Sequence, residues 1–300
     1  MSITVRAPAK INLHLGVGAP RADGYHPLVT VYQALGLCDD VTVTPSATWT
    51  LAVTVPDWMD ADAVPAAGGN IVDAAARLLA EHHGIASQAA VSITKSIPVA
   101  GGMAGGSADA AAALVALDRL WELGTHDDDL LRIAAELGSD VPFALLGGTA
   151  LGTGRGERVE RLPDPTTWWW VVVPSAKGLS TPAVYRRFDE LSPDTPAEPT
   201  DARAVLLALS TGNPEILAGA LHNDLESAAL DLRPDLADLL ELGESSGALR
   251  GLVSGSGPTC VFLTESADAA RGVATRLSAQ HDVVLVSNGP VAGAHVVSYG

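Results

Sequence analysis

The pattern of apolar residues at the start of the chain predicts a sheet followed by a helix. Apolar runs of strand length, separated by Gly, Pro and Asp at turn positions, occur at 3–6, 10–17, 30–34, 41–44 and 49–55. From residue 71 to 83 the apolar residues recur at helical spacing instead. Asn70 precedes this stretch as a candidate N-cap, and Gly84 follows it as a candidate stop.

Strand and helix patterns alternate through the rest of the chain. Further strands are predicted at 90–97, 168–173, 259–263, 283–286 and 295–298. Further helices are predicted from about 107 to 123 and at 127–137, 182–191, 202–210, 214–221, 232–241 and 267–281. This loose alternation predicts an α+β protein with mixed sheets.

Two stretches of changed composition indicate how the chain divides. Residues 152–165 are rich in charge, and residues 192–200 are rich in Pro, Asp and Thr. Because 300 residues exceed the ~100–200 of one typical domain, we place a boundary at the first stretch and predict domains at 1–158 and 159–300. The Trp run at 168–170 follows this boundary. We expect it in a strand core and at the domain interface rather than in a ligand platform.

Composition and charge exclude several classes of protein. Hydrophobic residues make up 47% of the chain and charged residues 18%, which excludes a disordered chain. The apolar runs are too short to span a bilayer, and the N-terminus lacks a secretory pattern, so we expect a cytoplasmic protein without a membrane partner. A net charge of −17 argues against a nucleic-acid partner, because phosphates would be repelled. Cys38 and Cys260 have no spacing typical of a disulfide framework or a zinc site.

The strongest chemical signal is a glycine-rich stretch from Pro98 to Asp109. Its sequence, PVAGGMAGGSAD, lies between a predicted strand and a predicted helix. The four glycines let the backbone approach a ligand closely, and the N-terminus of the helix attracts an anion. The stretch has neither the Lys-Ser or Lys-Thr pair of a Walker loop nor the glycine order of a dinucleotide fold. We interpret it as a phosphate cradle, with a flexible turn before a helix as the alternative.

Three other stretches carry candidate functional residues. Residues 251–259 form a second glycine cluster before a strand, which alone would also suit a hairpin. Lys10 and Asn12 lie in an apolar strand, where an ammonium group requires a carboxylate or an anionic ligand unless it reaches water along its own stem. Asp140 follows Gly138-Ser139 and precedes Val-Pro-Phe, a position that also suits a helix N-cap or a turn.

Together, these stretches resemble the GHMP kinase superfamily, which is named for galactose, homoserine, mevalonate and phosphomevalonate kinases. The three superfamily motifs match at 8–13, 98–108 and 251–259. Residues 21–28 (RADGYHPL) and 137–143 (LGSDVPF) resemble the branch that phosphorylates a cytidyl-diphosphate alcohol in non-mevalonate isoprenoid biosynthesis. Ala104 and Ala108 depart from the motif, since many members have glycine or serine there.

The resemblance implies a two-domain fold and a catalytic pair. Its N-terminal nucleotide-binding domain would be like domain 2 of ribosomal protein S5, and its C-terminal domain would be ferredoxin-like. Asp140 would accept the proton of the substrate hydroxyl, and Lys10 would neutralise charge beside it. ATP would be the co-substrate, with Mg²⁺ bound through the nucleotide and no separate metal site.

The resemblance also implies residues for each substrate. ATP would be bound by Pro98, Val99, Ala100, Gly101, Gly102, Met103, Ala104, Gly105, Gly106, Ser107 and Ala108, with Asn70 and Lys95 as candidates for the adenine pocket. The cytidyl-diphosphate alcohol would be bound by Asn12, Tyr25, His26, Thr181 and Tyr185.

The expected reaction transfers the γ-phosphoryl group of ATP to a tertiary 2-hydroxyl, in a monomer or a homodimer. The alternatives are a GHMP kinase for another small alcohol, such as mevalonate or homoserine, and a nucleotide-binding protein without catalysis.

Overall fold

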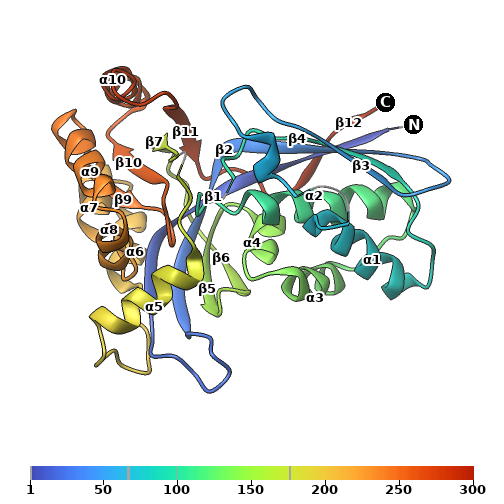
Figure 1. The fold of residues 1–300 in the computed structure, drawn as a ribbon, viewed down its shortest axis with the longest axis horizontal. Coiled ribbons are helices and arrows are strands. Elements are labelled where there is room, and N and C mark those ends of the chain that lie inside the picture. The colour runs from blue at the N-terminus through green and yellow to red at the C-terminus, as the bar shows by residue number, and fades with distance from the viewer. Residues whose placement is uncertain (1, 66–67, 100, 176) are drawn as a thin grey trace.

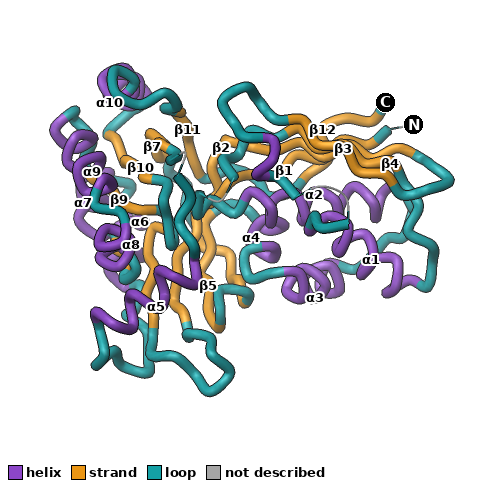
Figure 2. The backbone as a smooth tube through the Cα atoms, in the orientation of Figure 1, coloured by secondary structure: helices purple, strands orange, loops and turns teal. Residues whose placement is uncertain are grey.

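The molecule is built around two sheets (Figures 1 and 2). The computed structural model describes residues 2–65, 68–99, 101–175 and 177–300. Among these, eight strands form the larger sheet, in the order β12-β1-β2-β4-β3, with β5 and β6 continuing from β2 and with β8 beside β1. The strands are β1 (Ile3–Val17), β2 (Leu28–Thr44), β3 (Thr50–Thr54), β4 (Ala90–Thr94), β5 (Thr149–Gly154), β6 (Arg158–Leu162), β8 (His222–Asn223) and β12 (His295–Tyr299).

The strands β1 and β2 are longer than the sequence predicts. Each replaces two predicted strands, because the chain continues through Pro8 in β1 and through the polar residues 38–40 in β2. The pairing of β1 with β2 shifts register between Pro8 and Ala9. A proline has no N–H for the ladder and is accommodated at such an irregularity, so it bends the strand without ending it.

One face of the larger sheet is covered by helices from the first half of the chain (Figure 1). These are α1 (Ile71–His83), α2 (Gly105–Leu120), α3 (Asp127–Leu137) and α4 (Val141–Leu146), with the short 3-10 helix Ala61–Ala63 before them. Asn70 caps α1 as predicted, accepting a hydrogen bond from the N–H of Val72, and Gly84 ends it in the left-handed conformation. The buried alanines of α2 let this helix pack closely on β1 and β2.

The second sheet and its helices form the other part of the molecule. Its antiparallel strands are ordered β11-β7-β10-β9. They are β7 (Trp168–Val173), β9 (Arg250–Val253), β10 (Cys260–Thr264) and β11 (Leu285–Gly289). The helices are α5 (Thr181–Leu191), α6 (Arg203–Thr211), α7 (Pro214–Ala220), α8 (Glu226–Leu232), α9 (Asp235–Ser245) and α10 (Ala267–Leu277).

Two elements of this part were not predicted, and one was misplaced. The sequence pattern did not indicate α8 or β9, which are short. The helix predicted at 232–241 begins instead at Asp235, because Pro234 cannot lie inside a helix and is accommodated at its N-cap. Among the described residues, no helix is both long and apolar enough to cross a membrane.

A buried polar network joins the two sheets. Trp168 and Trp170 of β7 are almost completely buried, as expected for core and interface packing. The indole N–H of Trp170 donates to Gln33 Oε1 of β2 (2.9 Å), and Gln33 Nε2 donates to Asp164 (3.0 Å). Asp164 also accepts from the indole N–H of Trp168 (3.0 Å).

The chain crosses between the two parts more than once. The hairpin β5–β6 belongs to the larger sheet, so the predicted division after residue 158 falls at the first residue of β6. The last strand, β12, returns to pair with β1, which brings the two termini side by side (Figure 1).

Candidate active site

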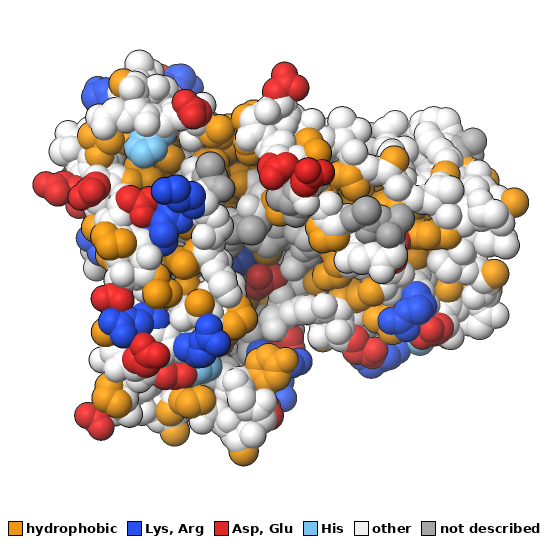
Figure 3. All heavy atoms as spheres, viewed as in Figure 1, with side chains coloured by type: hydrophobic (Ala, Val, Ile, Leu, Met, Phe, Trp, Pro, Cys, Tyr) orange, Lys and Arg blue, Asp and Glu red, His pale blue; other side chains and the backbone are white. Residues whose placement is uncertain are grey.

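Two cavities meet between the two parts of the molecule. One, of about 480 Å³, is lined by the glycine loop (residues 98–108) and is called the loop cavity here. The other, of about 540 Å³, contains Lys10 and Asp140 and is called the Asp140 cavity. Both are lined by Gly102, Ala104 and Thr181, so they adjoin at these residues. Figure 3 shows this face hollowed near its middle, between the two parts.

The glycine loop packs directly on the second glycine cluster (residues 251–259). A Cβ added at Gly102, whose φ is +77°, would lie 2.2 Å from the carbonyl oxygen of Ser254. The N–H of Thr259 donates to the carbonyl of Gly101 (3.3 Å), and the Ser254 hydroxyl donates to that of Gly102 (3.3 Å). The second cluster is also the turn of the hairpin β9–β10, which confirms the hairpin interpretation of this stretch.

Asn223, which the sequence did not indicate, holds that turn. Its side-chain amide donates to the carbonyls of Val253 and Gly255, at 2.8 Å each, from the short strand β8. Because β8 pairs with β1, the turn is tied to the strand that carries Lys10. No local pattern marks a lone asparagine for such a role, since its partners lie about thirty residues further along the chain.

The helix α2 begins inside the glycine loop. It starts at Gly105, two residues before the predicted position, and Ala104 precedes it in the left-handed conformation (φ 58°). Gly105, Gly106 and Ser107 line the loop cavity in the first turn, where backbone N–H groups have no partner within the helix. A Cβ added at Gly106 would approach only Ile71, at 3.8 Å. This turn can therefore present its N–H groups to an anion.

The other residues predicted for ATP are placed in three ways. Pro98, Val99, Gly101, Asn70 and Lys95 also line the loop cavity. The side chains of Met103 and Ala108 line neither cavity, because both are fully buried in the hydrophobic core. Ala100 lies outside the described residues.

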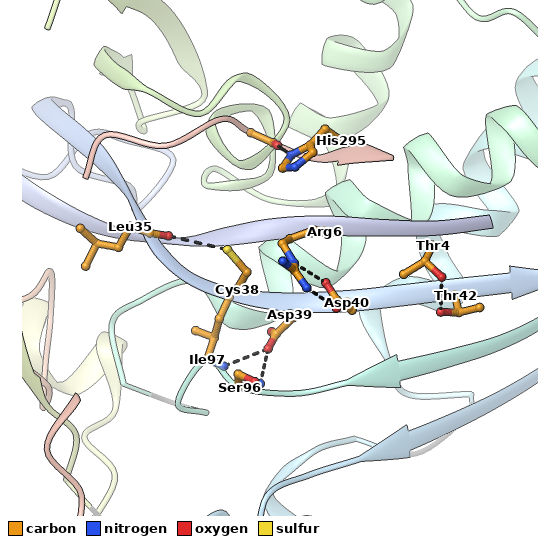
Figure 4. Close-up of polar contacts among 11 residues, drawn as sticks. Thr4, Arg6, Leu35, Cys38, Asp39, Asp40, Thr42, Ser96, Ile97 and His295 are labelled. Carbon is orange, nitrogen blue, oxygen red and sulfur yellow. Dashed lines mark hydrogen bonds and ion pairs between the residues drawn. The ribbon is translucent and has the colours of Figure 1, made fainter. Parts of the chain in front are cut away.

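Lys95 is paired inside the protein, under the glycine loop. Its ammonium donates to Asp109 Oδ2 of α2 (2.7 Å) and to Asp39 Oδ2 of β2, and all three side chains are buried. Figure 4 shows that Asp39 also accepts the N–H groups of Ser96 (2.6 Å) and Ile97 (2.9 Å), which follow β4. This cluster therefore anchors both ends of the segment that forms the loop.

Burial and neighbouring charges shift the pKa values of Asp109 and Lys95 in opposite directions. Burial raises the pKa of the Asp109 carboxyl to about 8, although Lys95 opposes the shift. Burial lowers the pKa of Lys95, but the two carboxylates outweigh it and the net shift is upward. The Oδ1 atom of Asp109 is buried and has no hydrogen-bond partner among the described residues.

Lys10 and Asp140 lie together in the Asp140 cavity. Lys10 Nζ is 3.8 Å from Asp140 Oδ2, an ion pair that is longer than a hydrogen bond. Lys10 is buried, and its ammonium donates to Asn12 Oδ1 (2.9 Å). Asp140 stands at the N-cap of α4, but its carboxylate makes no capping hydrogen bond and so is available to a ligand. The side-chain N–H of Asn12 in turn donates to the Thr30 hydroxyl (2.8 Å), which keeps the amide oxygen of Asn12 directed at Lys10.

Tyr32 of β2 completes this end of the cavity and was missed from the sequence. Its ring stacks on Phe143 of α4 at 4.9 Å between centroids, and Lys10 Nζ lies 5.6 Å from its centroid. Burial, together with the nearby charge of Asp140, raises the pKa of the Tyr32 phenol well above its usual value. The phenol therefore stays neutral beside the carboxylate.

Tyr25, His26 and Tyr185 gather at the other end of the Asp140 cavity. The ring of His26 lies 4.9 Å from that of Tyr185 between centroids. His26 Nδ1 is 2.8 Å from the carbonyl oxygen of Gly18, which can only accept, so this nitrogen carries the proton. Its Nε2 faces Asp189 Oδ2 at 3.6 Å. Tyr25 is exposed, whereas burial, with the charge of Asp140, raises the pKa of Tyr185.

The cavity therefore contains all the residues predicted for catalysis and for the second substrate. Lys10, Asn12, Tyr25, His26, Asp140, Thr181 and Tyr185 line it. The hydroxyl of Thr181 is 2.8 Å from that of Ser256 in the second glycine cluster. Arg155, Arg186 and Asp189 line it as well, without having been predicted.

Family models match both parts of this chain. The model of the GHMP kinases N terminal domain matches residues 70–148, and the model of the GHMP kinases C terminal domain matches residues 204–283. The chain belongs to the GHMP kinase family, as its motifs predicted.

Two relatives and one solved structure that are similar to this chain carry the name of the same kinase. A protein of Nocardioides sp. (strain ATCC BAA-499 / JS614) called 4-diphosphocytidyl-2-C-methyl-D-erythritol kinase is 69% identical over 98% of this chain and 100% of its own length. A protein of the same name from Thermobifida fusca (strain YX) is 52% identical over 99% of this chain and 98% of its own. A crystal structure of 4-(cytidine 5'-diphospho)-2C-methyl-D-erythritol kinase has a TM-score of 0.76 and 33% identity, covering 96% of this chain and 98% of that chain.

The buried cluster predicts a pH dependence of stability. An unfolded aspartate has a pKa of about 4, whereas that of Asp109 is raised to about 8. Between these values the folded protein holds a proton that the unfolded chain has lost, so this group makes the free energy of unfolding fall as pH rises from about 4 to about 8. Asp109→Asn should remove that part of the fall, measured by urea unfolding from pH 5 to 9.

Asp118→Asn is the matched control. Asp118 is a buried carboxylate of the same helix, and its Oδ1 accepts the N–H of Thr125 (2.9 Å). This variant measures what removing a buried carboxylate of the same helix does to stability outside the Lys95 cluster. An unchanged slope in Asp109→Asn would show that Asp109 is ionised throughout.

Proposed function

We propose that the chain transfers the γ-phosphoryl group of ATP to the 2-hydroxyl group of 4-diphosphocytidyl-2-C-methyl-D-erythritol, giving the 2-phosphate and ADP. The observation that carries this function is that the loop cavity and the Asp140 cavity adjoin at Gly102, beside the Lys10–Asp140 pair. The names of the relatives at 50–69% identity support the acceptor. The chain is an ATP-dependent small-molecule kinase of isoprenoid biosynthesis.

The loop cavity binds ATP. The first turn of α2 receives the triphosphate, because its free N–H groups and the positive end of the helix dipole attract an anion. Asn70 and Lys95, the candidates for the adenine pocket, lie on the wall of the same cavity. Mg²⁺ bound together with the nucleotide would supply positive charge to the phosphate groups. Within the described ranges no group of three or more His, Cys, Asp or Glu could hold a metal ion.

Asp140 and Lys10 act on the reacting groups. Asp140 accepts the proton of the 2-hydroxyl while that oxygen bonds to the γ-phosphorus. The bond from the γ-phosphorus to its bridging oxygen breaks, and ADP leaves with the electron pair. Lys10, 3.8 Å from Asp140, supplies positive charge beside the transferred group. Alignment and charge, rather than covalent chemistry, lower the barrier in such transfers.

The aromatic end of the Asp140 cavity binds the cytidyl group. Tyr25 and Tyr185 offer ring faces to the flat cytosine. His26 reads the hydrogen-bonding edge of the base through Nε2, since Nδ1 is engaged by Gly18. Thr181 and Asn12 also line this cavity, and they would bind the diphosphate and the erythritol hydroxyls.

The choice of acceptor tests the function. With ATP and purified protein, ADP release should require the cytidyl-diphosphate compound, because free methylerythritol leaves the base-binding groups unpaired. Mevalonate and homoserine, the acceptors of the alternative kinases, should not be phosphorylated. Comparable turnover of any acceptor without the cytidyl group would contradict the proposal, and ATP binding without turnover of any acceptor would favour a protein without catalysis.

Asp140→Asn should abolish most of the turnover while ATP still binds. The asparagine has the same shape but cannot take the hydroxyl proton, and a general base contributes about 10²–10⁴ in rate. We would measure kcat by ADP release and ATP affinity by calorimetry. Asp282→Asn, at an exposed position far along the chain, serves as the control. If Asp140→Asn kept half of the wild-type kcat, Asp140 would not be the base.

Gly106→Val tests the phosphate cradle. The side chain would enter the loop cavity with only Ile71 near it, so folding should persist while ATP affinity falls at least tenfold. Gly219→Val is the matched control, because Gly219 is an exposed helical glycine of α7 with open space around it. Melting curves of both variants separate lost binding from lost folding. ATP affinity equal to that of Gly219→Val would contradict the cradle.

A further inference from the structure

Arg155 lies at the wall of the Asp140 cavity, in the turn between β5 and β6. The glycines on both sides have positive φ, +76° at Gly154 and +100° at Gly156, as this tight turn requires. The N–H of Arg155 donates to Glu157 Oε2 (2.6 Å), and that of Gly156 donates to Thr153 (3.0 Å). The backbone that carries Arg155 is therefore held in one conformation.

The same turn is packed against Tyr32. A Cβ added at Gly156 would lie 2.3 Å from the Tyr32 hydroxyl, and one added at Gly152 would lie 2.6 Å from its ring. Because Tyr32 is buried and stacked on Phe143, the turn rests on a rigid surface. The position of Arg155 is thus set by the part of the cavity that contains Asp140.

The guanidinium of Arg155 lies over the ring of Tyr25. Its Cζ atom is 4.9 Å from the ring centroid, within the range of a cation–π interaction. Tyr25 is 54% exposed, at the tip of the loop between β1 and β2, and among the described residues its ring makes no aromatic contact. Arg155, which belongs to the β5–β6 hairpin of the larger sheet, therefore restrains the Tyr25 ring.

Among the residues that the structure describes, Arg155 forms no ion pair with a carboxylate. Most arginines of the chain have such a partner, for example Arg21 with Asp23 and Arg187 with Asp231. Within the described ranges, the guanidinium of Arg155 has neither a hydrogen bond nor an ion pair, although acidic residues far outnumber basic ones. A cation without an ion-pair partner among the described residues is thus held over an exposed aromatic ring on the wall of the cavity.

We infer that Arg155 is a positioning residue for the acceptor, which holds the Tyr25 ring ready to stack on the cytosine. The inference rests on the proposed function. An aromatic ring has two faces, and the guanidinium takes one of them, so the base can stack on the other. A ring that is already oriented avoids the entropy cost of ordering it when the substrate binds. Arg155 thereby links the base-binding end of the cavity to Tyr32 at its catalytic end.

Steady-state kinetics of Arg155→Ala test this inference. The KM for the cytidyl-diphosphate acceptor should rise about five- to thirtyfold, the range of a cation–π interaction that binding desolvates. The kcat and the KM for ATP should not change, because Arg155 touches neither the Asp140 carboxylate nor the loop cavity. Arg155→Lys keeps a cation on the ring and should recover part of the affinity. Arg158→Ala, in the same hairpin but exposed and outside the cavity, is the matched control.

A double-mutant cycle with Tyr25→Leu separates positioning from direct charge. If Arg155 acts through the ring, Arg155→Ala should raise the acceptor KM no further once the ring is gone. An effect of full size in the Tyr25→Leu background, or an equal rise in the KM for ATP, would overturn the inference. If the wild-type protein phosphorylates the acceptor and Arg155→Ala has an unchanged KM, this inference alone fails. If the wild-type protein does not phosphorylate the acceptor, both it and the proposed function fail.

Discussion

The site depends on a backbone contact that leaves no room for a side chain. Gly102 lies so close to the carbonyl oxygen of Ser254 that a Cβ would stand 2.2 Å from it. Through this contact the glycine loop of the larger sheet rests on the hairpin β9–β10 of the second sheet. The two cavities adjoin at the same residue. Backbone packing therefore sets how closely a phosphoryl donor and its acceptor approach each other.

Positive charge is scarce in this acidic chain, and each lysine at the site has a separate task. Lys10 lies beside the Asp140 carboxylate, the proposed base. Lys95 is paired with Asp39 and Asp109 under the glycine loop. Burial raises the pKa of the Asp109 carboxyl to about 8, although Lys95 opposes the shift. The cluster ties the segment that forms the loop to β2 and α2.

The long strands β1 and β2 connect the two ends of the Asp140 cavity. β1 carries Lys10 and Asn12, and β2 carries Tyr32. The loop between them carries Tyr25 and His26, so one strand pair supplies both the charged end and the base-binding end. Because both strands are paired on each side, the distance between the two ends is set by the sheet.

The amino-acid sequence determined the features that contiguous residues encode. Asn70 marks the start of α1 and Gly84 marks its end, and both were predictable because capping acts over a few neighbouring residues. The glycine loop and the residues around Asp140 were recognisable because each motif is a short unbroken stretch. Tyr25 and His26 were identified as candidates in the same way, from the motif residues beside them in the sequence. Local propensities and the amino-acid sequences of the motifs were sufficient to predict these parts.

Only the tertiary structure decided the roles that arise between distant segments. Asn223 acts on a turn near residue 254, and Arg155 acts on Tyr25 across the sheet. Tyr32 reaches Asp140 through strand register, which apolar periodicity does not specify for a single residue. Lys95, predicted for the adenine pocket, is engaged by two carboxylates that come from other elements. Pairing and packing between distant residues leave no pattern in one sequence, because either partner alone looks like an ordinary polar or aromatic residue.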